Sequence, residues 1–135
     1  MKGYNGIILE VDLTHDTIRK ISIPEDDLKK YIGGRGLGMK LLHDRLPQPG
    51  VDPLSPENPL LIMPGPFSGF PIPSSSRACM ITKSPKTSPL NKKYDYSSTV
   101  SYSNMGGFVG PEIRFAGYDG LLIIGKAKKP VYLFH

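Results

Sequence analysis

The sequence predicts an α+β fold that is dominated by largely antiparallel β-sheets, with one interrupted helical segment after the first hairpin. Three observations lead to this prediction. The apolar runs are short, the 15 glycines and 14 prolines separate them with turns, and the predicted segments follow the order β-β-α-α-β-β-β-β. A doubly wound nucleotide-binding fold alternates strands with helices, so this order argues against that class. We expect residues 1–135 to form one domain.

The first two strands are predicted to form a hairpin. Residues 6–13 are apolar and β-branched, and their second half alternates apolar with acidic residues, which is typical of a strand with one solvent-facing side. Residues 14–17 contain Asp and Thr side chains of the kind that hydrogen-bond their own backbone in turns. Residues 18–23 then place isoleucine at alternate positions in their second half, which completes the hairpin.

The helical segment is predicted to begin at Pro24. Proline suits the first turn of a helix, and the acidic residues that follow it favour the positive end of the helix dipole. Three of the four residues 33–36 are glycine, and glycine is costly inside a helix, so we expect an interruption there. Apolar residues then recur at helical spacing over residues 37–46, which predicts a second helix.

Short apolar runs predict the remaining strands. They cover residues 60–63, 77–82, 121–124 and 130–135. Residues 83–103 are interpreted as a basic, polar connection, residues 104–110 as a glycine-rich turn, and residues 111–116 as at least one helical turn. The last predicted strand runs to the final residue, which suggests that the sequence continues beyond it.

Net charge and composition restrict the partners. The formal net charge of +5 permits an anionic ligand. The more specific hypothesis is that the ligand is a phosphate or pyrophosphate. Tyr94, Tyr96 and Tyr102 lie among lysines, a pattern that suits stacking on nucleic acid, but a solvated loop explains it better. No nucleic-acid-binding motif accompanies them, and we expect no nucleic-acid partner.

The residue types that perform catalysis or bind metal are sparse. The one cysteine, Cys79, lies in an apolar strand pattern typical of an inert packing residue, and the three histidines are far apart. We therefore predict no catalytic and no metal-ligating residue in this chain. The first residues lack the apolar stretch of a signal peptide, and no apolar run approaches the length of a membrane span. These features predict a cytoplasmic protein without a membrane partner.

Three segments are candidates for binding an anion, and each has a purely structural alternative. In the glycine-rich residues 33–38, Arg35 either reaches an anion or a neighbouring domain, or merely accompanies a helix break. This run follows a helix instead of a strand, so it does not match a dinucleotide fingerprint. Arg77 follows three small serines and either binds a phosphate or is a surface arginine on a flexible loop. The turn with Asn104 and Gly106 either forms an anion-holding concavity or is an ordinary turn.

The order of several motifs resembles the N-terminal domain of the aldehyde:ferredoxin oxidoreductases, which are tungsten or molybdenum bis-pterin enzymes. The resemblance covers the whole chain. Its matching blocks are GIILEVDLTHDTIRK, YIGGRGLGMKLL, DPLSPENPLLIMPGPFSGFPIPSSSR, TKSP and SNMGGFVGPEIRFAGYDGLLIIGKAKKPVYL. Their joint occurrence in this order is more specific than any single glycine run.

The resemblance implies two β-sheets that form a base for a tungsten or molybdenum bis-pterin cofactor. It implies that Arg77 pairs with a pterin phosphate, that Asn104 hydrogen-bonds the pterin, and that Gly106 allows close approach. The complete enzyme would oxidise an aldehyde to its carboxylate and pass electrons through a [4Fe–4S] cluster to ferredoxin. That cluster is held by four cysteines in later domains, so the remaining domains are implied partners.

Two features depart from the family pattern. Serines stand at positions 75 and 76, where the family commonly has glycine before the arginine, and residues 86–103 are longer than usual. The longer stretch is interpreted as a lid, an interface or an added surface loop. Since the cluster ligands and the later pocket residues lie outside this chain, we expect the isolated chain to be inactive. The alternative is a non-catalytic binding or scaffold subunit from a truncated or split gene.

Overall fold

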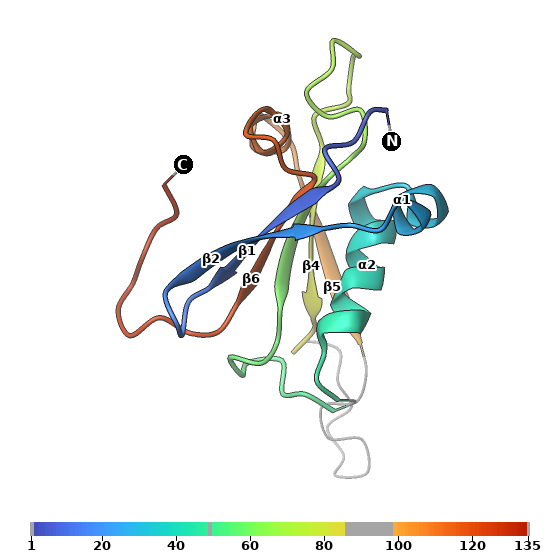
Figure 1. Cartoon of the computed structure of the whole chain (residues 1–135). Helices are drawn as coiled ribbons and strands as arrows, with labels where there is room; N and C mark the ends of the chain where they lie inside the picture. Colours follow the sequence, from blue (N-terminus) through green and yellow to red (C-terminus); the bar gives the residue numbers. More distant parts are fainter. Residues whose placement is uncertain (1, 49, 86–98, 135) are drawn as a thin grey trace.

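The structure, a computed structural model, describes residues 2–48, 50–85 and 99–134 (Figure 1). The elements of this part follow in the order β1 (Ile7–Asp12), β2 (Thr17–Ser22), α1 (Glu25–Tyr31), α2 (Gly34–Arg45), β3 (Leu60–Pro64), β4 (Ala78–Lys83), β5 (Val100–Met105), α3 (Val109–Phe115) and β6 (Gly120–Ile124). Most of the long polar stretch interpreted above as a lid, interface or surface loop (residues 86–98) lies outside the described residues, and so do Tyr94 and Tyr96.

The described strands form one sheet in the order β2-β1-β6-β3-β4-β5. Neighbouring strands are antiparallel except β1 and β6, which are parallel. This arrangement confirms the predicted α+β, β-dominated and largely antiparallel class. It differs from the two sheets that the resemblance implies, because β6 pairs with β1 on one side and β3 on the other. β6 thereby joins the N-terminal hairpin to β3–β5 in a single sheet.

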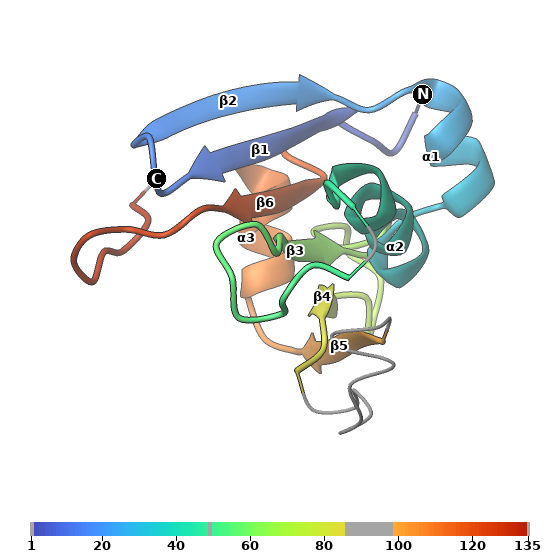
Figure 2. The same cartoon turned by 90° about the horizontal axis from the view of Figure 1, so that it is seen from below.

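Helices α2 and α3 lie on opposite faces of the sheet (Figures 1 and 2). The core lies beneath α2, where Leu37 and Leu42 pack on side chains from the central strands. Its buried members are Ile8, Ile23, Leu28, Leu37, Leu42, Leu61, Met63, Cys79, Ile81 and Leu122. The alternation of side chains along each strand separates these residues from the face that α3 covers. Among the described helices, none is both long and apolar enough to cross a membrane.

The helical segment is interrupted as expected, but the break is shorter than predicted and begins one residue earlier. The break lies at Ile32 and Gly33, and the glycines at positions 34 and 36 belong to α2 itself. Close packing explains why glycine is tolerated in this helix. A Cβ on Gly38 would lie 2.1 Å from Ile81 Cδ1, so only a residue without a side chain lets α2 approach β4 this closely.

Strand β5 differs from the prediction of a polar connection over residues 83–103 and a turn from residue 104. Its residues Val100–Met105 are mostly polar and exposed. β5 is nevertheless an edge strand, paired with β4 from Ala78 opposite Met105 to Lys83 opposite Val100. Backbone hydrogen bonds form this pairing and do not depend on apolar side chains, so hydrophobic patterning could not reveal it.

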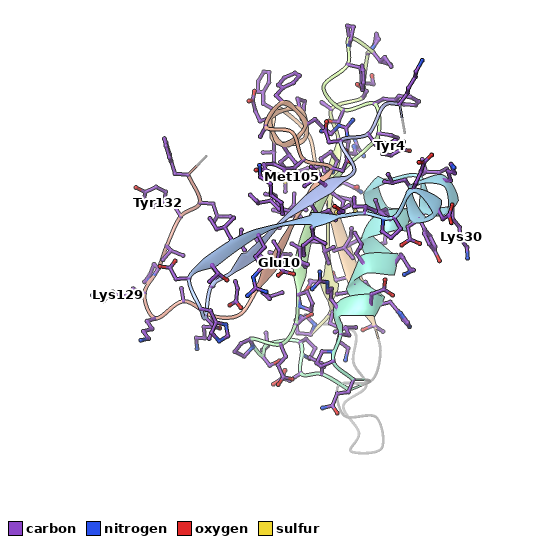
Figure 3. All side chains as sticks on the ribbon, viewed as in Figure 1. Tyr4, Glu10, Lys30, Met105, Lys129 and Tyr132 are labelled. Atoms are coloured by element: carbon purple, nitrogen blue, oxygen red, sulfur yellow. The ribbon has the colours of Figure 1, made fainter. Side chains whose placement is uncertain are left out.

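The strand predicted for residues 130–135 is wrong over its described part. Residues 131–134 form no strand, and their side chains are exposed. Figure 3 shows Lys129 and Tyr132 on an arm that extends away from the sheet, and Tyr132 is 86% exposed. β6 already pairs with β1 and β3 on its two edges, so no free edge remains beside it for a hairpin partner.

Candidate functional site

Arg77 lies between a loop and the start of β4. The loop over residues 65–76 leaves β3, and the backbone N–H of Gly65 donates a hydrogen bond of 3.3 Å to the carbonyl of Arg77. This bond closes the loop at its base and fixes the backbone of Arg77 beside the end of β3. The Arg77 side chain is exposed, and within the described part of the chain its guanidinium has no ion-pair partner.

Asn104 lies in β5, opposite Cys79 of β4. Directly opposed residues point to the same face of a sheet, so Asn104 shares the face on which Cys79 packs beneath α2. The Asn104 side chain is exposed, and its amide makes no hydrogen bond to another described residue. The sequence had placed Asn104 in a turn; in the strand its direction is fixed by the β4–β5 register.

The structure brings Arg77 and Asn104 to one shallow pocket of about 340 Å³. The pocket is lined by Gly34, Arg35, Met63, Gly65, Arg77, Ala78, Cys79, Tyr102 and Asn104. Gly106, the third predicted residue, lies just beyond β5 and is not among these lining residues. A Cβ on Gly106 would meet no atom within 4 Å, so the space around it is open.

The charge of the pocket is positive. Two of the lining residues are arginines and none is acidic. The first turn of α2 also contains no acidic residue, whereas the first turn of α1 contains three. The partial positive charge of the α2 N-terminus is therefore not offset by side chains of its own first turn. Such a pocket suits the oxygen atoms of an anion.

Cys79 forms part of the pocket floor. Burial raises the pKa of the Cys79 thiol, and the charge of Arg35 opposes this effect. A thiol with a raised pKa stays protonated at neutral pH, which suits a packing residue better than a nucleophile or a metal ligand. Within residues 2–48, 50–85 and 99–134, no three His, Cys, Asp or Glu side chains gather as a group that could hold a metal ion.

Residues 8–134 match the family model described as "Aldehyde ferredoxin oxidoreductase, N-terminal domain". The chain belongs to the aldehyde ferredoxin oxidoreductase family. The resemblance inferred from the sequence motifs is thereby confirmed, as is the assignment to the N-terminal part of the family.

Individual relatives agree with this assignment. The chain is 42% identical over 134 residues to a tungsten-containing aldehyde ferredoxin oxidoreductase of Pyrococcus abyssi. It is also 42% identical over 136 residues to a protein of Pyrococcus furiosus named "Aliphatic sulfonate oxidoreductase, WOR-like subunit". Each alignment covers 99% of this chain and 20% of the relative, so the chain spans about a fifth of the length of these relatives.

A solved structure has the same fold over the part that matches this chain. It is the active site complex BamBC of benzoyl coenzyme A reductase, in complex with 1,5-dienoyl-CoA. The TM-score is 0.82 at 36% sequence identity, and the match covers 94% of this chain and 18% of the other. The names of these similar proteins include an aldehyde ferredoxin oxidoreductase, an aliphatic sulfonate oxidoreductase and a benzoyl coenzyme A reductase, so similarity to them does not by itself define a substrate.

Sequence reasoning identified Arg77 and Asn104 as candidates in this member of the aldehyde ferredoxin oxidoreductase family but missed Tyr102 as a pocket residue. For Arg35 it left three alternatives open: binding an anion, reaching a neighbouring domain, or merely accompanying a helix break. The useful signal was the spacing of Tyr102 and Asn104, since residues two apart in a strand point to the same face. This spacing can be interpreted only when residues 100–105 are known to form a strand.

Gly110 supports the backbone that leads into Arg77. A Cβ at this position in α3 would lie 2.6 Å from the carbonyl oxygen of Ser76 and 2.8 Å from Ser68 Oγ. We expect Gly110→Ala to lower the free energy of unfolding by about 1–3 kcal/mol, because a backbone atom must move to relieve the contact. Urea denaturation of the purified chain measures this change in the free energy of unfolding.

Gly106→Ala is the control and should stay within about 0.5 kcal/mol of wild type, since its Cβ meets no neighbour. Equal stability of the two variants would refute the close packing at Gly110.

Proposed function

We propose that this chain is the pterin-binding N-terminal module of an oxidoreductase that holds a tungsten or molybdenum bis-pterin cofactor. The proposed complete enzyme oxidises aldehydes to carboxylates, with ferredoxin as the electron acceptor. The observation that carries the proposal is the single pocket in which Arg77 and Asn104 meet, in a chain of the aldehyde ferredoxin oxidoreductase family. Four of the relatives are named as tungsten-containing aldehyde ferredoxin oxidoreductases, which supports the choice of cofactor.

The chemistry of the pocket residues fits a pterin with phosphate groups. Arg77 offers a planar guanidinium that can donate two parallel N–H bonds to phosphate oxygens. Asn104 offers an amide that can both donate to and accept from a pterin edge. Gly106 leaves open space beside the end of β5, where a bulky ring can approach the backbone. When bound, the metal–pterin group supplies the oxidation–reduction chemistry, and this chain supplies binding and orientation.

The α3 side of the chain supports the need for further domains. Large apolar side chains are exposed on the loop of residues 65–76 and on and beside α3. They are Phe67, Phe70, Ile72, Phe108, Val109 and Phe115. Four of them, Phe70, Ile72, Phe108 and Phe115, line one surface pocket, and exposed apolar side chains gathered in this way often mark an interface. Because the chain spans about a fifth of its relatives, we assign the covering partner to the remaining four fifths of such an enzyme.

Electron transfer depends on those remaining domains. Cys79, the one cysteine, is buried, whereas a [4Fe–4S] cluster is held by several cysteine thiolates. In the proposed enzyme the cluster is therefore bound elsewhere in the complete protein, which also carries the contact with ferredoxin. The substrate pocket is assigned to the same domains, since they make up about four fifths of the length of the relatives.

The proposal predicts different behaviour for the chain and for the complete protein. The purified 135-residue chain should show no iron–sulfur absorption and no aldehyde-dependent reduction of an artificial acceptor. The complete protein should contain tungsten or molybdenum together with pterin, and it should reduce ferredoxin when an aldehyde is added. Metal analysis, pterin fluorescence after oxidation and an acceptor assay measure these properties. A complete protein with neither metal nor pterin would refute the proposal and favour the scaffold alternative. Turnover of an aldehyde by the isolated chain would refute its assignment as only one module of the enzyme.

A further inference from the structure

A stacked arginine lies in the same pocket as Arg77. The Arg35 guanidinium carbon lies 4.5 Å from the centre of the Tyr102 ring, and both residues line the pocket. We propose that Arg35, positioned by Tyr102, is a second guanidinium that binds the oxygens of a phosphate ester or diphosphate in this pocket. This inference extends the proposed pterin-binding function, in which only Arg77 contacts a phosphate.

Three elements bring these side chains together. Arg35 lies in the first turn of α2, Arg77 lies just before β4, and Tyr102 lies in β5. Tyr102 is opposite Ile81 and Asn104 is opposite Cys79, so both β5 side chains lie on the face that α2 covers. The pocket is therefore bounded by an arginine from the helix and by an arginine from the sheet.

The Arg35 guanidinium lies over the Tyr102 ring, and no hydrogen bond joins its N–H groups to another described residue. A guanidinium that lies against an aromatic ring uses its flat face, while its N–H groups point outward in its own plane. Holding the side chain in one place also reduces the conformational entropy that is lost when it binds an anion. Within the described residues Arg35 has no ion-pair partner, and no acidic side chain lines the pocket to neutralise it.

A purely structural role for the stack makes a different prediction. If Arg35 and Tyr102 only fasten α2 to the edge strand, their substitution changes stability but leaves the affinity for anions unaltered. If Arg35 binds phosphate, its substitution lowers the affinity even in a fully folded variant. Both side chains are exposed, with Tyr102 at 47%, so folded variants are expected.

The test is a calorimetric titration of inorganic pyrophosphate into the cofactor-free complete protein. We expect Arg35→Gln to weaken binding about tenfold, as for the loss of a charge-assisted hydrogen-bonding partner. Tyr102→Leu should weaken binding a few-fold, whereas Tyr102→Phe keeps the ring and should bind like wild type. The control is Arg19→Gln, which removes the same charge from β2 at the opposite edge of the sheet. It should change the affinity by less than about twofold, since charges so far apart are largely screened.

The outcomes separate this inference from the proposed function. Equal affinity of Arg35→Gln and Arg19→Gln, or no pyrophosphate binding by wild type, would overturn the role of Arg35. Equal affinity of Tyr102→Leu and Tyr102→Phe would overturn the positioning role of the ring. If Arg35→Gln weakens binding in a complete protein that never contains pterin, the proposed function fails and the phosphate site stands. If pterin is retained by Arg35→Gln as well as by wild type, the cofactor phosphate is not the ligand of Arg35.

Discussion

Arg77→Ala in the complete protein is expected to lower the bound tungsten or molybdenum and pterin at least tenfold. Arg77 lines the pocket with an exposed guanidinium that is not engaged in an ion pair within the described residues. A guanidinium–phosphate contact is charge-assisted and often bidentate, so its loss costs more than the loss of a neutral hydrogen bond. Each factor of ten in affinity corresponds to about 1.4 kcal/mol, which is within the range of one such contact.

The measurement is metal and pterin content per protein after gel filtration, with wild type and variant purified in parallel. Arg19→Ala is the matched control, because it removes an exposed arginine from the opposite edge of the sheet. It should retain the wild-type content. Arg77→Lys should retain an intermediate amount, because lysine keeps the charge and loses the planar fork. Full cofactor content in Arg77→Ala would remove this residue from the site.

Asp119→Ala is expected to destabilise the chain by about 3–5 kcal/mol, the cost of leaving a buried charge without its partner. Asp119 forms an ion pair with Arg114, and the exposed fractions of the two side chains are 3% and 7%. Burial lowers the pKa of Arg114. The Asp119 carboxylate also accepts hydrogen bonds from the backbone N–H groups of Asn5, at 3.1 Å, and Gly6, at 2.6 Å.

These contacts tie the segment before β1 to the turn between α3 and β6, so their loss should loosen the parallel β1–β6 pairing. Urea denaturation of the purified chain, followed by circular dichroism, measures the change. Asp44→Ala is the control, since its ion pair with Lys40 is much more exposed and should contribute less than about 1 kcal/mol. If both variants unfold at the same urea concentration, the buried ion pair contributes no more to stability than the exposed one.

Local sequence patterns predicted much of the fold. The alternation of residues 6–13 and 18–23 predicted the β1–β2 hairpin, and Pro24 with its acidic successors predicted the start of α1. The apolar runs at residues 60–63 and 121–124 predicted the central strands β3 and β6. These elements share one property: their own residues carry the periodicity or the capping signal that stabilises them.

The elements that were predicted wrongly depend on their neighbours. β5 is a polar edge strand that exists because β4 offers it a backbone partner. Residues 131–134 have the composition of a strand but find no partner, because β6 is already paired on both edges. Strand pairing is a contact between distant segments, so no local pattern decides which apolar run obtains a partner.

The same division applies to the site. The sequence by itself determined which chemical groups were available, an arginine after small residues and an asparagine beside glycines, and its motif order determined the family. Only the tertiary structure decided that Arg77 and Asn104 share a pocket with Arg35 and Tyr102, and that Gly106 lies outside its lining. The physical reason is that side-chain direction in a sheet follows from register and from the face that a helix covers. The register is fixed by the pairing of β5 with β4, and the covered face is fixed by the packing of α2 on β3 and β4. No short stretch of sequence contains either contact.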